Sequence, residues 1–227
     1  MIRVNPMPPQ IDRALLEKLA QIDPVTIGHY REWGFVDPAV RPVITGRRVV
    51  GTAVTLITPA IDTSMIPYAL GMVRPGDVLV IDRLGDMRHA CMGGVVALAA
   101  KLAGVAGVII DGLACDFAEF VQYDLPVWCR GEAALTGKSL AMDGALNVPV
   151  CCGGVAVMPG AAVLADSGGV FVLDSSEIEE IVAIGLPMQQ SEPERLKRLR
   201  AGEKLGALSG ATSKIEAALA SYRASPR

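Results

Sequence analysis

Two loops that follow predicted buried strands carry the residue types best suited to chemistry. The first loop, DRLGDMRHACMGGVV at 82–96, brings acidic, basic and histidine side chains up to Gly93-Gly94, where a helix is expected to begin. A helix start presents free backbone N–H groups, and the glycines add no Cβ to obstruct them. The sequence therefore predicts a carboxylate- or phosphate-binding segment formed by Gly93, Gly94, Val95 and Val96. The alternative is that the glycines only permit close helix packing.

The second loop, DGLACD at 111–116, places Asp111 and Asp116 on either side of a tight Gly112 turn. Mg²⁺ keeps several of its waters and often takes only one or two protein carboxylates, so Asp116 is a candidate ligand. The same residue is also well placed to cap the helix that follows. Cys115 has no basic neighbour in sequence that would lower its pKa, which favours a packing role over nucleophilic chemistry.

Other kinds of site lack support in the sequence. His29 and His89 are the only histidines and lie far apart, so a histidine-based metal site is not expected. The five cysteines form no CxxC pair, which argues against a zinc site and a disulfide framework. No GxSxG, P-loop or GxGxxG pattern occurs. Nucleotide chemistry is therefore unsupported.

Alternating strand and helix patterns position the two loops. Apolar β-branched runs predict buried strands at 49–59, 78–82 and 107–111, with a helix at 93–102 between the last two. Strand, helix, strand is a parallel crossover unit, whose ligands bind beyond the carboxyl ends of the strands. The remaining patterns predict a helix at 11–22, a short helix at 116–122, a strand at 126–131, short strands within 148–173, and helices at 191–205 and 211–223.

These patterns predict an α/β fold with mixed sheets in one domain spanning 1–227. An N-terminal helical segment at 1–45 precedes an α/β core at 46–174, and a charged C-terminal helical arm follows at 175–227.

The composition excludes several classes of protein and of binding partner. Hydrophobic residues make up 51% of the 227 residues, which excludes a disordered chain. Lys+Arg 21 against Asp+Glu 24 gives a net charge of -3, without the basic excess that nucleic-acid binding requires. No stretch predicts a membrane span, and the N-terminus lacks a signal-peptide pattern, so we expect a cytoplasmic protein. The mean hydropathy of +0.40 is high for a monomer and predicts a homo-oligomer.

The ordered motifs resemble those of the RraA-like family, which includes the 4-hydroxy-4-methyl-2-oxoglutarate aldolases. The matching stretches are VVGTAVTL, RPGDVLVID, the Gly93-Gly94 helix start, AGVAGVIIDGLACD, LPVWCRG, the segment from NVPVCCGG to GGVFVL, and ERLKRLRAGEKL. The resemblance implies a swivelling β/β/α domain that assembles as a trimer or a hexamer, with active sites between subunits.

The resemblance also implies roles for individual residues. In the aldolases a divalent cation, Mg²⁺ or Mn²⁺, is held by the aspartate that matches Asp116, and pyruvate sits on that cation. The arginine that precedes it in the family is Cys115 here, so we count Cys115 with Gly93, Gly94, Val95 and Val96 among the substrate-binding residues. A further family aspartate is replaced by Gly94. We expect another cation to substitute, from the set Arg74, Arg83, Arg88 and Arg130, with Arg88 first because it precedes the glycine helix start. A catalytic base from the neighbouring subunit's arm would be Glu192 or Glu194.

The leading functional hypothesis is a divalent-metal-dependent carbon–carbon lyase, an aldolase or an oxaloacetate decarboxylase type, acting on a small 2-oxo acid. Its substrate partner would be a small carboxylate. One alternative is a non-catalytic regulator of the same fold that binds other proteins. Another is a metal-dependent enzyme with a different reaction on a small carboxylated substrate.

Overall fold

The computed structural model of this chain describes residues 1–224. It divides into two compact units, Met1–Gly185 and Leu186–Arg227. The first unit contains all the strands. The strands are β1 (Ile2–Val4), β2 (Arg41–Pro42), β3 (Val49–Ile57), β4 (Asp77–Asp82), β5 (Gly107–Asp111), β6 (Leu113–Ala114), β7 (Val127–Cys129), β8 (Gly131–Glu132), β9 (Gly144–Leu146), β10 (Val150–Cys152), β11 (Val155–Val157), β12 (Ala162–Asp166) and β13 (Gly169–Leu173).

Helices of different lengths separate and follow these strands. They are α1 (Arg13–Leu19), α2 (Pro24–Ile27), α3 (Met65–Leu70), α4 (Gly94–Leu102), α5 (Phe117–Gln122), the 3-10 turn η1 (Ser175–Glu177), α6 (Ile178–Arg200), α7 (Leu205–Leu208) and α8 (Ala211–Ala224). None of these helices is long and apolar enough, over the described part of the chain, to cross a bilayer.

The central sheet is a parallel core with antiparallel additions. β3, β4, β5 and β7 pair in parallel in that order, while β9 and β12 pair antiparallel with β3 and β2 pairs antiparallel with β7. All six residues of β4 are buried, as expected for a strand covered on both faces. The predicted crossover unit is confirmed, because α4 connects the parallel neighbours β4 and β5.

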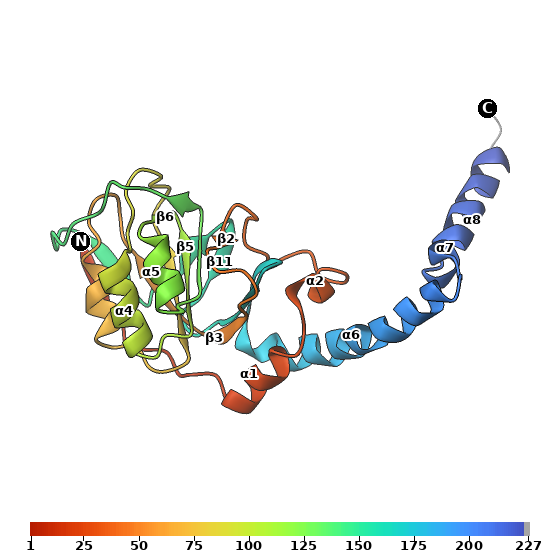
Figure 1. The fold of residues 1–227 in the computed structure, drawn as a ribbon, viewed down its shortest axis with the longest axis horizontal. Coiled ribbons are helices and arrows are strands. Elements are labelled where there is room, and N and C mark those ends of the chain that lie inside the picture. The colour runs from red at the N-terminus through yellow and green to blue at the C-terminus, as the bar shows by residue number, and fades with distance from the viewer. Residues whose placement is uncertain (225–227) are drawn as a thin grey trace. The chain divides into compact units, whose positions relative to one another are not determined.

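Side-chain alternation along β4 divides the core into two parts. Leu79 and Ile81 pack into a cluster with residues of α3, α4 and α5, and Figure 1 shows α4 and α5 on the same side of the sheet. Val78 and Val80 point the other way, into a cluster with residues of β10 to β13. The result is a helical layer on one face and β structure on the other. The expected mixed α/β fold class is confirmed.

The C-terminal helices differ from their predicted bounds. The sequence predicts a helix at 191–205, whereas α6 runs from Ile178 to Arg200 and contains Pro187 and Pro193. Proline lacks the N–H of a regular helix turn, so it normally predicts a helix end. In the second unit no described side chain up to residue 222 is buried. Helices this exposed receive little stabilisation from packing within their own unit.

Candidate functional site

The carboxylates that end β4 and β5 have structural roles. Asp82 accepts hydrogen bonds from the backbone N–H of Leu84 at 2.7 Å and of Cys151 at 3.1 Å. Asp111 accepts from the N–H of Gly153 at 2.7 Å and pairs with Arg130. Both side chains therefore attach the β10–β11 hairpin to the carboxyl edge of the sheet.

Backbone pairing brings the two predicted loops together. The N–H of Cys91 donates to the carbonyl of Leu113, and the N–H of Cys115 donates to the carbonyl of Met92, each at 2.9 Å. The segment before α4 thus runs alongside the segment that leads from β5 into α5. This arrangement places Asp116 next to Gly93 and Gly94.

Asp116 directs its carboxylate away from its own helix. Its backbone is left-handed, with φ 58° and ψ 47°, a conformation that aspartate tolerates better than most residues. Although it occupies the N-cap position of α5, its side chain makes no capping hydrogen bond there. Instead, Oδ2 accepts from the N–H of Gly94, at 2.8 Å, at the start of α4. The capping alternative is therefore wrong for this side chain.

The two glycines serve different neighbours. A Cβ on Gly93 would lie 2.5 Å from Oδ2 of Asp116, so glycine is needed for the carboxylate to approach the helix start. A Cβ on Gly94 would lie 2.9 Å from Cγ of Glu119 in α5. Helix packing therefore accounts for Gly94, while Gly93 makes room for Asp116.

A cavity of about 210 Å³ lies at this junction. It brings together six of the predicted site residues, Gly93, Gly94, Val95, Val96, Cys115 and Asp116. The segment 90–92 and the residues Thr63, Thr136 and Gly137 complete the lining. The last three were missed in the sequence. Nothing there marks the segment before α3, which carries Thr63, or the loop at 133–143, which carries Thr136 and Gly137, as a neighbour of α4.

One buried carboxylate holds that missed loop in place. Asp62 is 4% exposed and accepts hydrogen bonds from the N–H groups of Leu140, Met142 and Asp143, at 3.3, 2.6 and 3.2 Å. It also accepts from the hydroxyl of Ser64 at 2.6 Å. Burial opposes ionisation, but these hydrogen bonds prevail and hold the pKa of Asp62 below its ordinary value.

The cavity thiols are neutral at physiological pH. Burial raises the pKa of Cys115 to about 11, and the adjacent Asp116 carboxylate acts in the same direction. Burial likewise raises the pKa of Cys91 to about 12. A thiol with so high a pKa is a poor nucleophile. This supports the packing interpretation of Cys115.

The donors at the cavity fit a magnesium-like cation better than a zinc-like one. Asp116 uses one hydrogen bond on Gly94, and a carboxylate has about four lone-pair sites, so it can still bind a cation. Within the described residues there is no group of three or more His, Cys, Asp and Glu side chains arranged to hold a metal. Zinc sites take three or four such ligands, whereas Mg²⁺ accepts one or two carboxylates and water.

None of the four candidate arginines lines this cavity. Arg83 is fully buried and donates to the carbonyl of Thr58 at 2.6 Å and to Asp86 at 2.7 Å. Arg130 pairs with Asp111 and with Asp37, and Arg74 pairs with Asp77. Arg88 is exposed, and its backbone N–H donates to Asp86 at 3.0 Å. The assignment of Arg88 as the substituting cation stays a prediction.

Glu192 and Glu194 lie in the part of α6 that belongs to the second unit, and both are exposed. Glu194 is 3.8 Å from Nζ of Lys197, one helix turn later. Their role as a catalytic base supplied to a neighbouring subunit stays a prediction.

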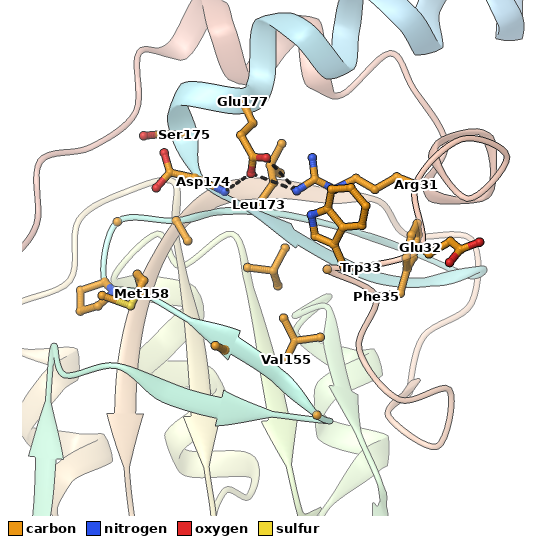
Figure 2. Close-up of a pocket in the computed structure, with 17 residues that line it drawn as sticks. Arg31, Glu32, Trp33, Phe35, Val155, Met158, Leu173, Asp174, Ser175 and Glu177 are labelled. Carbon is orange, nitrogen blue, oxygen red and sulfur yellow. Dashed lines mark hydrogen bonds and ion pairs between the residues drawn. The ribbon is translucent and has the colours of Figure 1, made fainter.

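A second cavity, of about 670 Å³, is larger, but the one arginine in its described lining is already paired with a glutamate of the same cavity. Figure 2 shows Arg31 reaching Glu177, with Nη2 at 2.9 and 3.0 Å from the two carboxylate oxygens. Glu177 also accepts from the N–H of Asp174 at 3.2 Å, and the Arg31 guanidinium lies 4.6 Å from the centre of the Trp33 ring. We therefore place the candidate site at the smaller cavity, where the Asp116 carboxylate faces a helix start.

Comparisons with known proteins agree with this architecture. The model of the RraA-like family, described as Aldolase/RraA, matches residues 26–172. A protein from Halalkalibacterium halodurans, provisionally named 4-hydroxy-4-methyl-2-oxoglutarate aldolase, is 34% identical over 63% of this chain and 68% of its own length. A protein from Shewanella oneidensis with the same provisional name is 29% identical over 67% of this chain and 93% of its own length.

A solved structure shows the same fold. Streptomyces coelicolor RraAS2, an unusual member of the RNase ES inhibitor RraA protein family, superposes with a TM-score of 0.70 at 27% identity. The match covers 84% of this chain and 99% of RraAS2. The family thus includes proteins named as aldolases and proteins named as RNase inhibitors. The family model spans the strands and helices that build the Asp116 cavity, and the chain belongs to the RraA-like family.

Proposed function

We propose that this chain is a divalent-metal-dependent carbon–carbon lyase that acts on a small 2-oxo acid. The observation that carries the proposal is the Asp116 carboxylate, held out of its own helix and directed to a cavity at the start of α4. The provisional aldolase names of two relatives support the same reaction class.

In this proposal Asp116 binds Mg²⁺ or Mn²⁺. When bound, such a cation supplies Lewis-acid polarisation of a 2-oxo carboxylate. The N–H groups of Val95 and Val96, in the first turn of α4, receive the carboxylate group of the substrate. The N–H of Gly94 is not available for this purpose because it already donates to Asp116.

Replacement of Asp116 by asparagine tests the proposal. Asparagine tolerates the left-handed backbone and keeps an oxygen to accept from the Gly94 N–H, so the D116N protein should fold. We expect D116N to lose Mg²⁺ and Mn²⁺ binding, measured by calorimetry. We also expect it to lose the activity that forms pyruvate from 2-oxo acid substrates. A charged ligand has been replaced by a neutral one.

Asp124 provides a matched control at the other end of α5. It also has a positive φ, 51°, and it is exposed and pairs with Arg47. The D124N variant should bind metal as the unmodified chain does. Equal metal binding by D116N and the unmodified chain would contradict the proposal.

A regulator that binds other proteins is the second candidate. It is favoured by the structural match to an RNase inhibitor family member and by a cavity whose described lining contains neither arginine nor lysine. Such a regulator has no need of a metal at Asp116. The calorimetric experiment therefore separates the two functions.

A further inference from the structure

The β10–β11 hairpin has one edge that no other described strand covers. β11 pairs antiparallel with β10 alone, and two glycines with positive φ, at 153–154, join the two strands. The residues that flank a two-residue turn, here Cys152 and Val155, form a hydrogen-bonded pair. The next pair along the ladder, Cys151 and Ala156, is therefore not hydrogen-bonded, because the two kinds of pair alternate.

The contacts on both sides of the hairpin agree with this pattern. The N–H of Cys151 donates to the carboxylate of Asp82 at 3.1 Å, which directs it away from β11. The N–H groups of Ala156 and Met158 donate to no described residue outside the hairpin. Alternate residues of a strand direct their main-chain groups to the same edge, so Gly154, Ala156 and Met158 face away from β10. All three are exposed, and such an unpaired edge is a template for another strand.

This edge opens into the larger of the two cavities, of about 670 Å³. Gly154, Ala156 and Met158 all belong to its lining. Figure 2 shows Met158 on one side of the cavity and Trp33 and Leu173 on the other. The whole lining lies in the first unit of the chain, and the volume is in the range of sites that bury a ligand.

The facing wall supplies a free donor and apolar surface. Arg31 is 9% exposed, and its Nε has no hydrogen-bond partner among the described residues. An unpaired buried N–H is unfavourable, and an incoming carbonyl oxygen would satisfy it. Trp33 and Met158 are 65% and 52% exposed. Tryptophan and methionine are enriched where proteins bind one another.

The shape of the cavity favours a single strand over a second copy of the same edge. Residues 31–35 and 172–175 form a wall opposite β11, so the edge is recessed. Paired strands lie about 4.7–4.9 Å apart, and two recessed edges cannot approach each other so closely. An extended peptide has both of its edges free and can enter the cavity.

We propose that the β11 edge binds an extended peptide segment of another protein, which adds to the hairpin as a third strand. The N–H and C=O of Ala156 form two hydrogen bonds with one residue of the peptide. A peptide carbonyl accepts from Nε of Arg31, and an apolar peptide side chain contacts Trp33 and Met158. The partner segment is therefore β-forming, with apolar residues at alternate positions. This surface is independent of Asp116 and of the lyase reaction.

A library of random eight-residue peptides displayed on phage tests the proposal on the full chain. Peptides are selected on the unmodified protein and counter-selected on A156P. Proline removes the N–H of residue 156, and strand edges tolerate it, because this N–H does not bond β10. A156V keeps the N–H and is the matched control. Synthetic copies of the enriched peptides should bind the unmodified chain and A156V with similar affinity, and A156P about 10- to 100-fold more weakly.

N-methylation of the selected peptides gives a second measurement that does not depend on a variant protein. A strand directs the N–H groups of alternate residues to opposite edges. Methylation of one alternate set should abolish binding, while methylation of the other set should leave most of the affinity.

Several results would overturn the proposal. Selection that enriches no peptide, or peptides that bind A156P as tightly as A156V, would show that the β11 edge takes no strand. Equal loss of affinity for both methylation patterns would exclude pairing through one edge of the peptide. A smaller mass of A156P than of A156V by light scattering would show that the edge joins copies of this chain instead.

Discussion

Gly93 is the residue on which the position of the Asp116 carboxylate depends. Because a Cβ at this position would lie 2.5 Å from Oδ2 of Asp116 and 2.8 Å from Sγ of Cys115, both side chains would have to move. The G93A variant should therefore bind Mg²⁺ about 10- to 100-fold more weakly, the usual cost of disturbing the support of a metal ligand. Its thermal stability should change little, because the groups that must move lie at the ends of side chains.

Gly71 offers the comparison. It ends α3 with an ordinary φ of -76°, and a Cβ there would meet one carbonyl oxygen at 3.4 Å. The G71A protein should keep its metal affinity in the same calorimetric titration. If G93A binds Mg²⁺ as tightly as the unmodified protein, metal binding does not depend on the present position of the Asp116 carboxylate.

At the scale of elements, the loop at 133–143 depends on Asp62. An amide at this position cannot accept as many N–H donors as the carboxylate does, so D62N should lower the free energy of unfolding by about 1–3 kcal/mol at pH 7. Urea unfolding of both proteins measures the difference.

The pH dependence of that difference has a definite sign. The pKa of Asp62 in the folded chain lies below its ordinary value of 3.8, so the unfolded state binds a proton first as the pH falls. The stabilisation is complete well above pH 3.8 and is lost as the pH falls below it. The difference in the free energy of unfolding between the unmodified protein and D62N should therefore become smaller as the pH is lowered. A difference that does not change with pH would contradict the role of the Asp62 carboxylate in holding the loop at 133–143.

Local sequence patterns predicted the elements that carry the site but not all of its walls. The apolar runs of β4 and β5 and the glycine start of α4 depend on neighbours in sequence, so their patterns were sufficient. The pairing of β1 with β9 joins residues 2–4 to 144–146, and no local pattern encodes it. The contribution of Thr136 and Gly137 to the cavity was missed for the same reason. The hydrogen bond from Gly94 to Asp116 also joins residues distant in sequence.

For the whole molecule, the outer face of α4 is a candidate interface between copies of the chain. Val95, Leu98 and Leu102 are 88%, 39% and 79% exposed, and their spacing puts them on one side of the helix. We propose that this face is covered in a homo-oligomer. The double variant L98K/L102K should then have a smaller mass by light scattering than the unmodified protein.

Val25 tests whether any exposed apolar residue has this effect. It is 60% exposed on α2, far from α4 in sequence, and V25K should leave the mass unchanged. An unmodified protein that is already monomeric, or a double variant of unchanged mass, would exclude α4 as the interface.

The hydrogen bond between the Gly94 N–H and Asp116 offers a spectroscopic signal for metal binding. A cation bound to Asp116 draws electron density from its carboxylate and so weakens the hydrogen bond that the Gly94 N–H donates to it. The NMR chemical shift of the Gly94 amide proton should therefore report how much of the protein has bound metal, without any substrate. Its rate of exchange with deuterated solvent should respond as well. The Gly94 amide proton could thus report metal binding at Asp116 during a titration, before any assay of turnover exists.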